Sequence, residues 1–146
     1  VQDQVARDTE WDTLLDEIAS GPPWYSPLRL VDSIANAGEM FIHHEDVRRG
    51  QPGWRPRELP AAQTAELTRS VASVLSRLLV RKAGCGVRAR MPGRDPTVLR
   101  KGEPVVTLVG EPGEILLWLS GRDAVELEFE SDPAAVGGLR QLQRGF

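Results

Sequence analysis

The spacing of hydrophobic residues changes near residue 85, and this change limits the possible folds more than any other feature. Before it, apolar residues recur every three or four positions, as in a helix with one buried face. After it, Val87, Ala89 and Met91 alternate with polar residues, as in a β-strand. The sequence therefore predicts an α+β protein, with a helical domain over residues 1–84 and a small α+β domain over residues 85–146.

Three helices are predicted before residue 85. The first follows Thr9, a good N-cap, and ends at the helix-breaking residues 21–23 (Gly-Pro-Pro). The second runs from Pro27 to about Arg49 and ends at residues 50–53 (Gly-Gln-Pro-Gly). The third covers roughly residues 61–82, and its apolar face consists of Leu67, Val71, Val74, Leu75, Leu78 and Leu79.

Strands and short helices are predicted in the second part. Residues 105–109 form an apolar run typical of a buried strand, and residues 112–120 predict a short apolar helix. Residues 125–130 alternate apolar side chains with glutamates, as in a strand with one wet face. A last helix is expected to begin at residues 131–133 (Ser-Asp-Pro), because proline in the first turn gives up no hydrogen bond.

Composition limits the environment and the partners. The 146 residues are 40% hydrophobic and 27% charged, close to the globular average. The formal charge of -3 arises from acids and bases along the whole length, which predicts no nucleic-acid partner and no membrane partner. A single cysteine, Cys85, cannot form an internal disulfide, and no apolar run approaches the roughly 20 residues of a membrane span. A cytoplasmic location is the simplest expectation.

A polar stripe runs along the second predicted helix. Its members lie four, three, four and three residues apart, so they share one helical face. Exposed helical stripes usually carry lysine and glutamate, whereas this one holds carboxylates, an amide and an imidazole, as a set of metal ligands would. The five residues are Asp32, Asn36, Glu39, His43 and Asp46.

Glu39 and His43 are the best ligand candidates in this stripe. They stand one turn apart, so a carboxylate oxygen and an imidazole nitrogen can meet a divalent ion about 2.0–2.2 Å from each. The same spacing often produces only a surface pair. The metal interpretation requires both side chains to face the interior of the helical domain. Asp46 can then hold the second ring N–H of His43, or it can cap a neighbouring helix.

The charged residues beside the stripe are interpreted more simply. His44, Glu45, Arg48 and Arg49 are expected to form a solvated face whose ion pairs contribute little. Cys85 has no base positioned beside it in the sequence and is interpreted as incidental.

Several sequence motifs resemble a known family. These are residues 36–49 (NAGEMFIHHEDVRR), 51–54 (QPGW) and 57–60 (RELP), together with residues 22–28 (PPWYSPL) and 102–106 (GEPVV). They are similar to the actinobacterial metal-binding proteins related to mycothiol-dependent maleylpyruvate isomerase. The likeness covers nearly the whole chain.

The resemblance implies a fold and a site. The fold would be a partial DinB-like four-helix bundle followed by the small α+β domain. The metal, usually zinc, would be held by one histidine on an early helix and by a Glu-x-x-x-His pair, which Glu39 and His43 match; Asn36 and Asp46 would support these ligands from behind. By this comparison, the helix that would bring the early histidine is expected to be missing from the chain. The chain is therefore expected to be the C-terminal two-thirds of a longer protein, with an incomplete site and a tendency to self-associate or to pair with the missing part.

The resemblance also implies a reaction class. A metal- and thiol-dependent transferase or isomerase would use mycothiol, or another low-molecular-weight thiol, with a small-molecule substrate. The alternative is a non-catalytic metal-binding or protein-interaction module of the same fold, because fold alone does not decide function.

Overall fold

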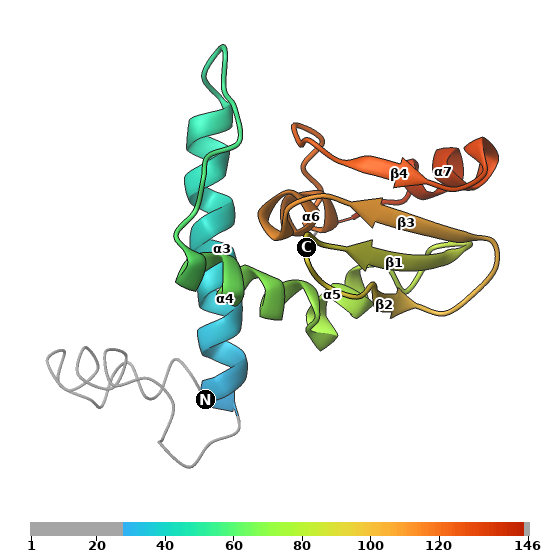
Figure 1. Cartoon of the computed structure of the whole chain (residues 1–146), viewed down its shortest axis with the longest axis horizontal. Coiled ribbons are helices and arrows are strands. Elements are labelled where there is room, and N and C mark those ends of the chain that lie inside the picture. Colours follow the sequence, from blue (N-terminus) through green and yellow to red (C-terminus); the bar gives the residue numbers. More distant parts are fainter. Residues whose placement is uncertain (1–27, 145–146) are drawn as a thin grey trace, which may run out of the picture. The chain divides into compact units, whose positions relative to one another are not determined.

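The computed structural model describes residues 28–144, with side chains from residue 37 onward (Figure 1). The chain divides into two units, residues 1–33 and 34–146. The helix predicted after Thr9 lies outside the described residues. No helix within residues 28–144 combines the length and the apolar character needed to cross a membrane.

The long predicted helix is confirmed as α3, Leu28–Arg49. Its buried face consists of Gly38, Phe41, Ile42 and Glu45, which recur at helical spacing. Its last turn carries Arg48 and Arg49, where the negative end of the helix dipole favours cations.

The third predicted helix is wrong as a single element, because it breaks after Val71. Helix α4 spans Ala61–Val71, and helix α5 spans Val74–Leu79. Ser73 caps α5 by accepting a hydrogen bond from the Ser76 backbone N–H, and the Ser76 hydroxyl donates to the Ser70 carbonyl. Serine side chains compete in this way for backbone partners, which favours a helix end over a helix interior.

A four-stranded mixed sheet follows, in the order β2-β1-β3-β4 (Figure 1). Strands β1 (Gly86–Arg90) and β3 (Val105–Val109) pair in parallel at its centre. The edge strands, β2 (Thr97–Arg100) and β4 (Glu128–Glu130), pair antiparallel with their neighbours. Strand β2 was not predicted, and β4 begins at Glu128 rather than at residue 125 as predicted.

Two short helices complete the unit. Helix α6, Pro112–Leu119, is buried at every residue and contacts both α4 and α5. Helix α7, Pro133–Arg140, begins as predicted, since the Asp132 carboxylate accepts a hydrogen bond of 2.8 Å from the Ala134 N–H. It contacts β3.

One hydrophobic core joins helices and sheet. Phe41 and Leu67 from the helices belong to the same buried cluster as Val106 and Leu108 from the sheet and Leu117 from α6. The α+β class is therefore confirmed. Within residues 28–144, the boundary predicted at residue 84 separates a part whose regular elements are all helices from a part that contains strands, but residues on both sides of it share this core.

The contact between α3 and the start of α6 predicts the effect of a single methyl group. A Cβ atom at Gly113 would lie 2.7 Å from the Phe41 Cζ atom, closer than packed atoms tolerate. We expect Gly113→Ala to lower the free energy of unfolding by about 1–2 kcal/mol in urea denaturation. Gly137→Ala in α7 is the control, because a Cβ there meets nothing within 4 Å and should stabilise the helix slightly. Equal effects of the two substitutions would contradict this contact.

Candidate functional site

Helix α3 carries Glu39 and His43 on its exposed side. The opposite side of α3 is the one that enters the core through Phe41 and Ile42. The expectation that both ligand candidates face the interior is therefore not met within the described part of the chain, because the core takes the other face of the helix. The two side chains remain one turn apart on one continuous face.

The exposed face of α3 is also partly apolar. Met40 and Val47 are each 71% exposed and lie beside the Glu39–His43 pair on the helix surface. These two side chains make the exposed face of α3 apolar at two positions seven residues apart.

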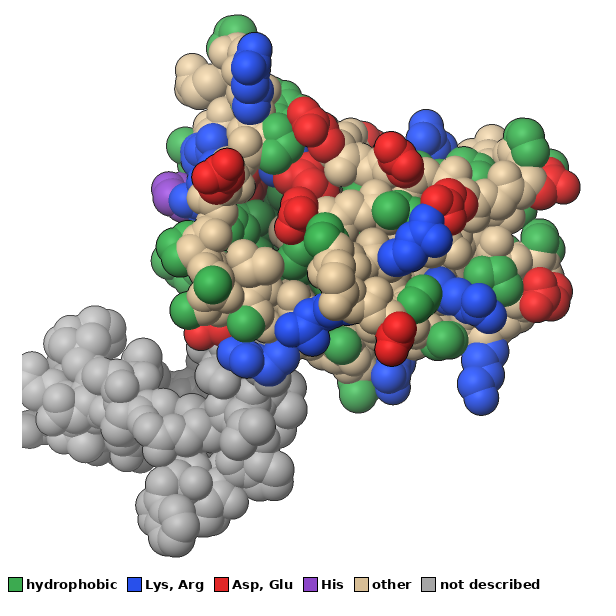
Figure 2. Space-filling view, viewed as in Figure 1, with side chains coloured by type: hydrophobic (Ala, Val, Ile, Leu, Met, Phe, Trp, Pro, Cys, Tyr) green, Lys and Arg blue, Asp and Glu red, His purple; other side chains and the backbone are tan. Residues whose placement is uncertain are grey.

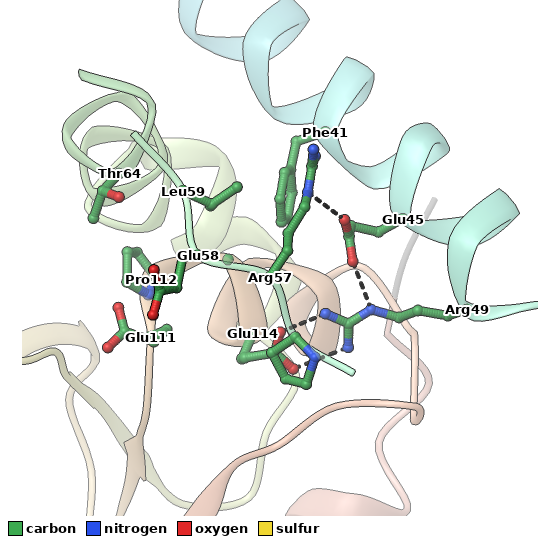
Figure 3. A pocket seen from close by; sticks show the side chains of 12 residues that line it. Phe41, Glu45, Arg49, Arg57, Glu58, Leu59, Thr64, Glu111, Pro112 and Glu114 are labelled. Carbon is green, nitrogen blue, oxygen red and sulfur yellow. Dashed lines mark hydrogen bonds and ion pairs between the residues drawn. The ribbon is translucent and has the colours of Figure 1, made fainter. Parts of the chain in front are cut away.

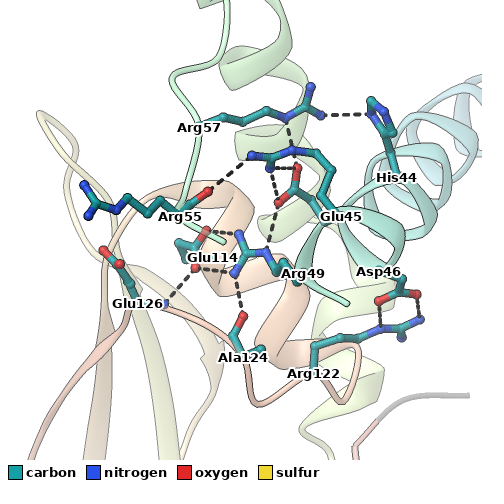
Figure 4. Close-up of polar contacts among 11 residues, drawn as sticks. His44, Glu45, Asp46, Arg49, Arg55, Arg57, Glu114, Arg122, Ala124 and Glu126 are labelled. Carbon is teal, nitrogen blue, oxygen red and sulfur yellow. Dashed lines mark hydrogen bonds and ion pairs between the residues drawn. The ribbon is translucent and has the colours of Figure 1, made fainter. Parts of the chain in front are cut away.

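The other three residues of the polar stripe are Asp32, Asn36 and Asp46. The side chains of Asp32 and Asn36 lie outside the described residues. Both carboxylate oxygens of Asp46 accept hydrogen bonds from Arg122, at 3.0 Å from Nε and 2.7 Å from Nη2 (Figure 4). Arg122, with a smaller contribution from His43, holds the pKa of Asp46 below its usual value. Asp46 thus ties α3 to the chain after α6.

No group of three or more His, Cys, Asp or Glu side chains in the described part could hold a metal ion by itself. Glu39 and His43 offer two donors of the types that zinc accepts, while a zinc site normally takes at least three protein ligands. Their assignment as metal ligands stays a prediction that needs a donor from outside residues 37–144.

A groove of about 780 Å³ lies between α3 and α4 next to this face. His43 and His44 from α3 line it together with Gln63 and Glu66 from α4. His43 therefore borders a hollow that has both polar and apolar walls.

Of the four charged residues next to the stripe, His44 is exposed and Arg48 is partly exposed, whereas the side chains of Glu45 and Arg49 are buried. The Glu45 side chain is only 1% exposed and accepts hydrogen bonds from three arginines (Figure 4). Arg48 Nη1 lies 2.7 Å from Glu45 Oε1, Arg49 Nε lies 2.9 Å from Oε2, and Arg57 Nε lies 2.9 Å from Oε1. The weak exposed pairs expected here are thus replaced by a buried cluster, because the buried side of α3 includes position 45.

Arg49 extends this cluster to α6. Its side chain is 5% exposed, and it pairs with the equally buried Glu114 through both Nη atoms. The same guanidinium lies 4.5 Å from the centre of the Trp54 ring and donates to the Ala124 carbonyl. Glu114 Oε2 also accepts a hydrogen bond of 2.8 Å from the Glu126 backbone N–H. Every charge in the cluster therefore has partners, as burial requires.

A pocket of about 430 Å³ opens beside the cluster (Figure 3). Figure 3 shows Arg57 and Glu45 on one side of it and the carboxylates of Glu58 and Glu111 on the other. Its apolar walls come from Phe41, Pro56, Leu59 and Pro112. An apolar lining with a few placed polar groups is the usual composition of a small-molecule site. Neither Glu111 nor Arg57 was singled out by the sequence analysis.

Cys85 is 5% exposed, and burial raises the pKa of its thiol. A buried thiol that stays protonated is a poor nucleophile.

Comparisons of the chain with protein-family models, with curated proteins and with solved structures found no match.

The buried cluster predicts a large effect from removing its central cation. Arg49→Met leaves Glu45 and Glu114 buried without their shared partner, and we expect it to lower the free energy of unfolding by roughly 3–5 kcal/mol. Arg90→Met removes a half-exposed pair with Glu130 and should cost less than about 1 kcal/mol. Urea denaturation of both variants measures the difference, and similar losses would show that the cluster is no stronger than a surface pair.

The cluster also predicts a pH dependence. Burial alone would raise the pKa of Glu45, but hydrogen bonds from Arg49 and Arg48 outweigh it and hold this pKa below the usual 4.5. A lowered acid pKa contributes stability above the unfolded-state value, and this contribution is lost as the pH falls through the folded-state value. We expect the free energy of unfolding to decline below pH 4.5, with a shallower decline in Glu45→Gln.

Exposed Glu130 supplies the control for this experiment. Glu130→Gln should leave the acid decline of the wild type unchanged. A decline in Glu45→Gln as steep as that in Glu130→Gln would assign the pH dependence to other carboxyl groups.

Proposed function

We propose that this chain binds a divalent metal, with Glu39 and His43 supplying two of the ligands. The observation that carries the proposal is the paired carboxylate and imidazole, one turn apart on an exposed helix face that Met40 and Val47 make partly apolar. Such a face suits an arrangement in which another segment covers the pair and brings the remaining ligand. A carboxylate and an imidazole favour zinc, and they also bind other divalent ions.

The resemblance described above extends this proposal to a fold and a reaction. Helices α3 and α4 would belong to a DinB-like bundle, and the protein would be related to mycothiol-dependent maleylpyruvate isomerase. With a metal bound, the chemistry supplied at an open coordination position would be a lowered pKa for a thiol or a water molecule. The lone, buried Cys85 is compatible with the reducing cytoplasm in which low-molecular-weight thiols act.

Two residues would take supporting roles in this site. Asn36 precedes Glu39 by one helical turn on the same side of α3. Asp46 would act mainly through its pair with Arg122, which holds the C-terminal half of α3 against the segment after α6. The groove that His43 lines offers a place for a small substrate or for the thiol.

The alternative is a non-catalytic metal-binding or interaction module. The exposed Met40 and Val47 favour it, because they give α3 a contact surface whether or not a reaction occurs there. A thiol-transfer assay with and without a chelator separates the two. An enzyme turns over substrate and stops when the chelator removes the metal, whereas a non-catalytic module shows no turnover in either condition.

Metal titration tests the ligand assignment. Glu39→Ala and His43→Ala should each weaken Zn²⁺ or Co²⁺ binding by about tenfold or more, since each removes one donor from a small set. His44→Ala is the matched control, because His44 lies on the same helix and its Nδ1 pairs with Arg57 Nη2 at 3.3 Å. Unchanged metal affinity in both ligand variants would overturn the assignment.

A further inference from the structure

Helix α5 buries a polar side chain and exposes apolar ones. Its buried residue is Ser76, whereas Val74 is 68% exposed and Leu78 is 49% exposed. The serine faces inward because its hydroxyl bonds the Ser70 carbonyl. The aliphatic side chains on the opposite side of the helix therefore have no role in the core of residues 34–144.

Cations surround these aliphatic side chains. Arg77 follows Val74 by three residues and so lies on the same side of the helix, and the exposed Arg81 and Lys82 follow at its end. Within residues 28–144 no ion pair neutralises any of the three. We call the surface formed by Val74, Leu75, Arg77, Leu78, Arg81 and Lys82 the α5 face.

The edge of the sheet continues the α5 face. Strand β2 contacts α5, and its Val98 is 41% exposed. Arg100 from β2 donates to the Arg81 carbonyl at 3.3 Å, which ties this strand to the end of α5. Figure 2 shows basic and hydrophobic side chains next to one another along the lower edge of the view, where Figure 1 places α5 and β2.

Basic and acidic residues are concentrated in different parts of the sequence. Residues 67–102 contain nine Lys or Arg and one Asp, whereas residues 103–132 contain eight acids and one Arg. The even mixing assumed from the net charge of -3 thus fails for the part of the chain that carries the α5 face. Such an asymmetry orients a molecule towards a negative surface.

We propose that the α5 face docks on an anionic lipid surface. Aliphatic side chains interspersed with unpaired cations suit the headgroup boundary, where the former enter the acyl region and the latter meet lipid phosphates. A nucleic acid would leave the aliphatic groups without an apolar phase, and the α5 face has no aromatic side chain on which bases could stack. This inference is independent of the metal site on α3.

Vesicle co-sedimentation of the chain tests the proposal. We expect binding to phosphatidylcholine vesicles that contain a quarter of phosphatidylglycerol, weak or no binding to pure phosphatidylcholine, and release by salt. Arg77→Glu with Arg81→Glu should reduce binding to the anionic vesicles by about tenfold or more. Val74→Ser with Leu78→Ser should weaken it as well, and both variants should keep the wild-type melting temperature within a few degrees because the four side chains are exposed.

Arg55→Glu with Arg94→Glu is the matched control. It changes the net charge equally at two exposed positions outside the α5 face, and it should retain most of the binding. Equal losses in control and α5-face variants would overturn the proposal, because net charge alone would then explain the binding. It would also be overturned if the wild type ignored anionic vesicles, including the case in which it bound DNA or polyglutamate instead.

Discussion

The arginine at the end of α3 holds the described unit together. Arg49 lies between Glu45 on its own helix and Glu114 on α6, and its side chain is almost completely buried. Desolvating three charges is costly, so the arrangement persists only because each side-chain oxygen and nitrogen in it finds a partner. Helix α6 packs against α4 and α5, and it follows directly on β3, so the position of α3 relative to the sheet depends on this contact. The pocket and the groove are both lined by residues of α3, so their shape depends on where this helix lies.

Much of the fold could be predicted from local patterns. The limits of α3, α6 and α7 follow from proline, glycine and capping residues, which act within a few positions of the chain. Strand β2 was missed because residues 97–100 are too short and too mixed to show alternation, and the pairing with β1 that stabilises them is a property of the hairpin. The break after Val71 depends on serine hydroxyls that bond backbone groups, which hydrophobic periodicity does not detect.

The candidate site, too, could be predicted only in part. The pair Glu39 and His43 could be recognised from its spacing, but its orientation could not, because both sides of α3 carry apolar residues and only packing decides which side is buried. The cluster around Glu45 was mistaken for a solvated face, since adjacent Glu and Arg residues are usually exposed. One signal was present in the sequence: Glu114 is the only charge in the apolar run from Pro112 to Leu119, and an acid in such a run needs a buried partner.

The shared core has a consequence for how the chain can be divided. Leu67 on α4 and Val106 on β3 are removed from water by the same cluster of side chains. A fragment that starts after Gly84 would keep every strand of the sheet yet lose α3, α4 and α5, and its apolar residues would face solvent. Helices and sheet are thus expected to melt in one cooperative transition, and fusion partners or proteolytic cuts are better tolerated at exposed turns such as residues 92–95 than at the border between helical and strand-forming sequence.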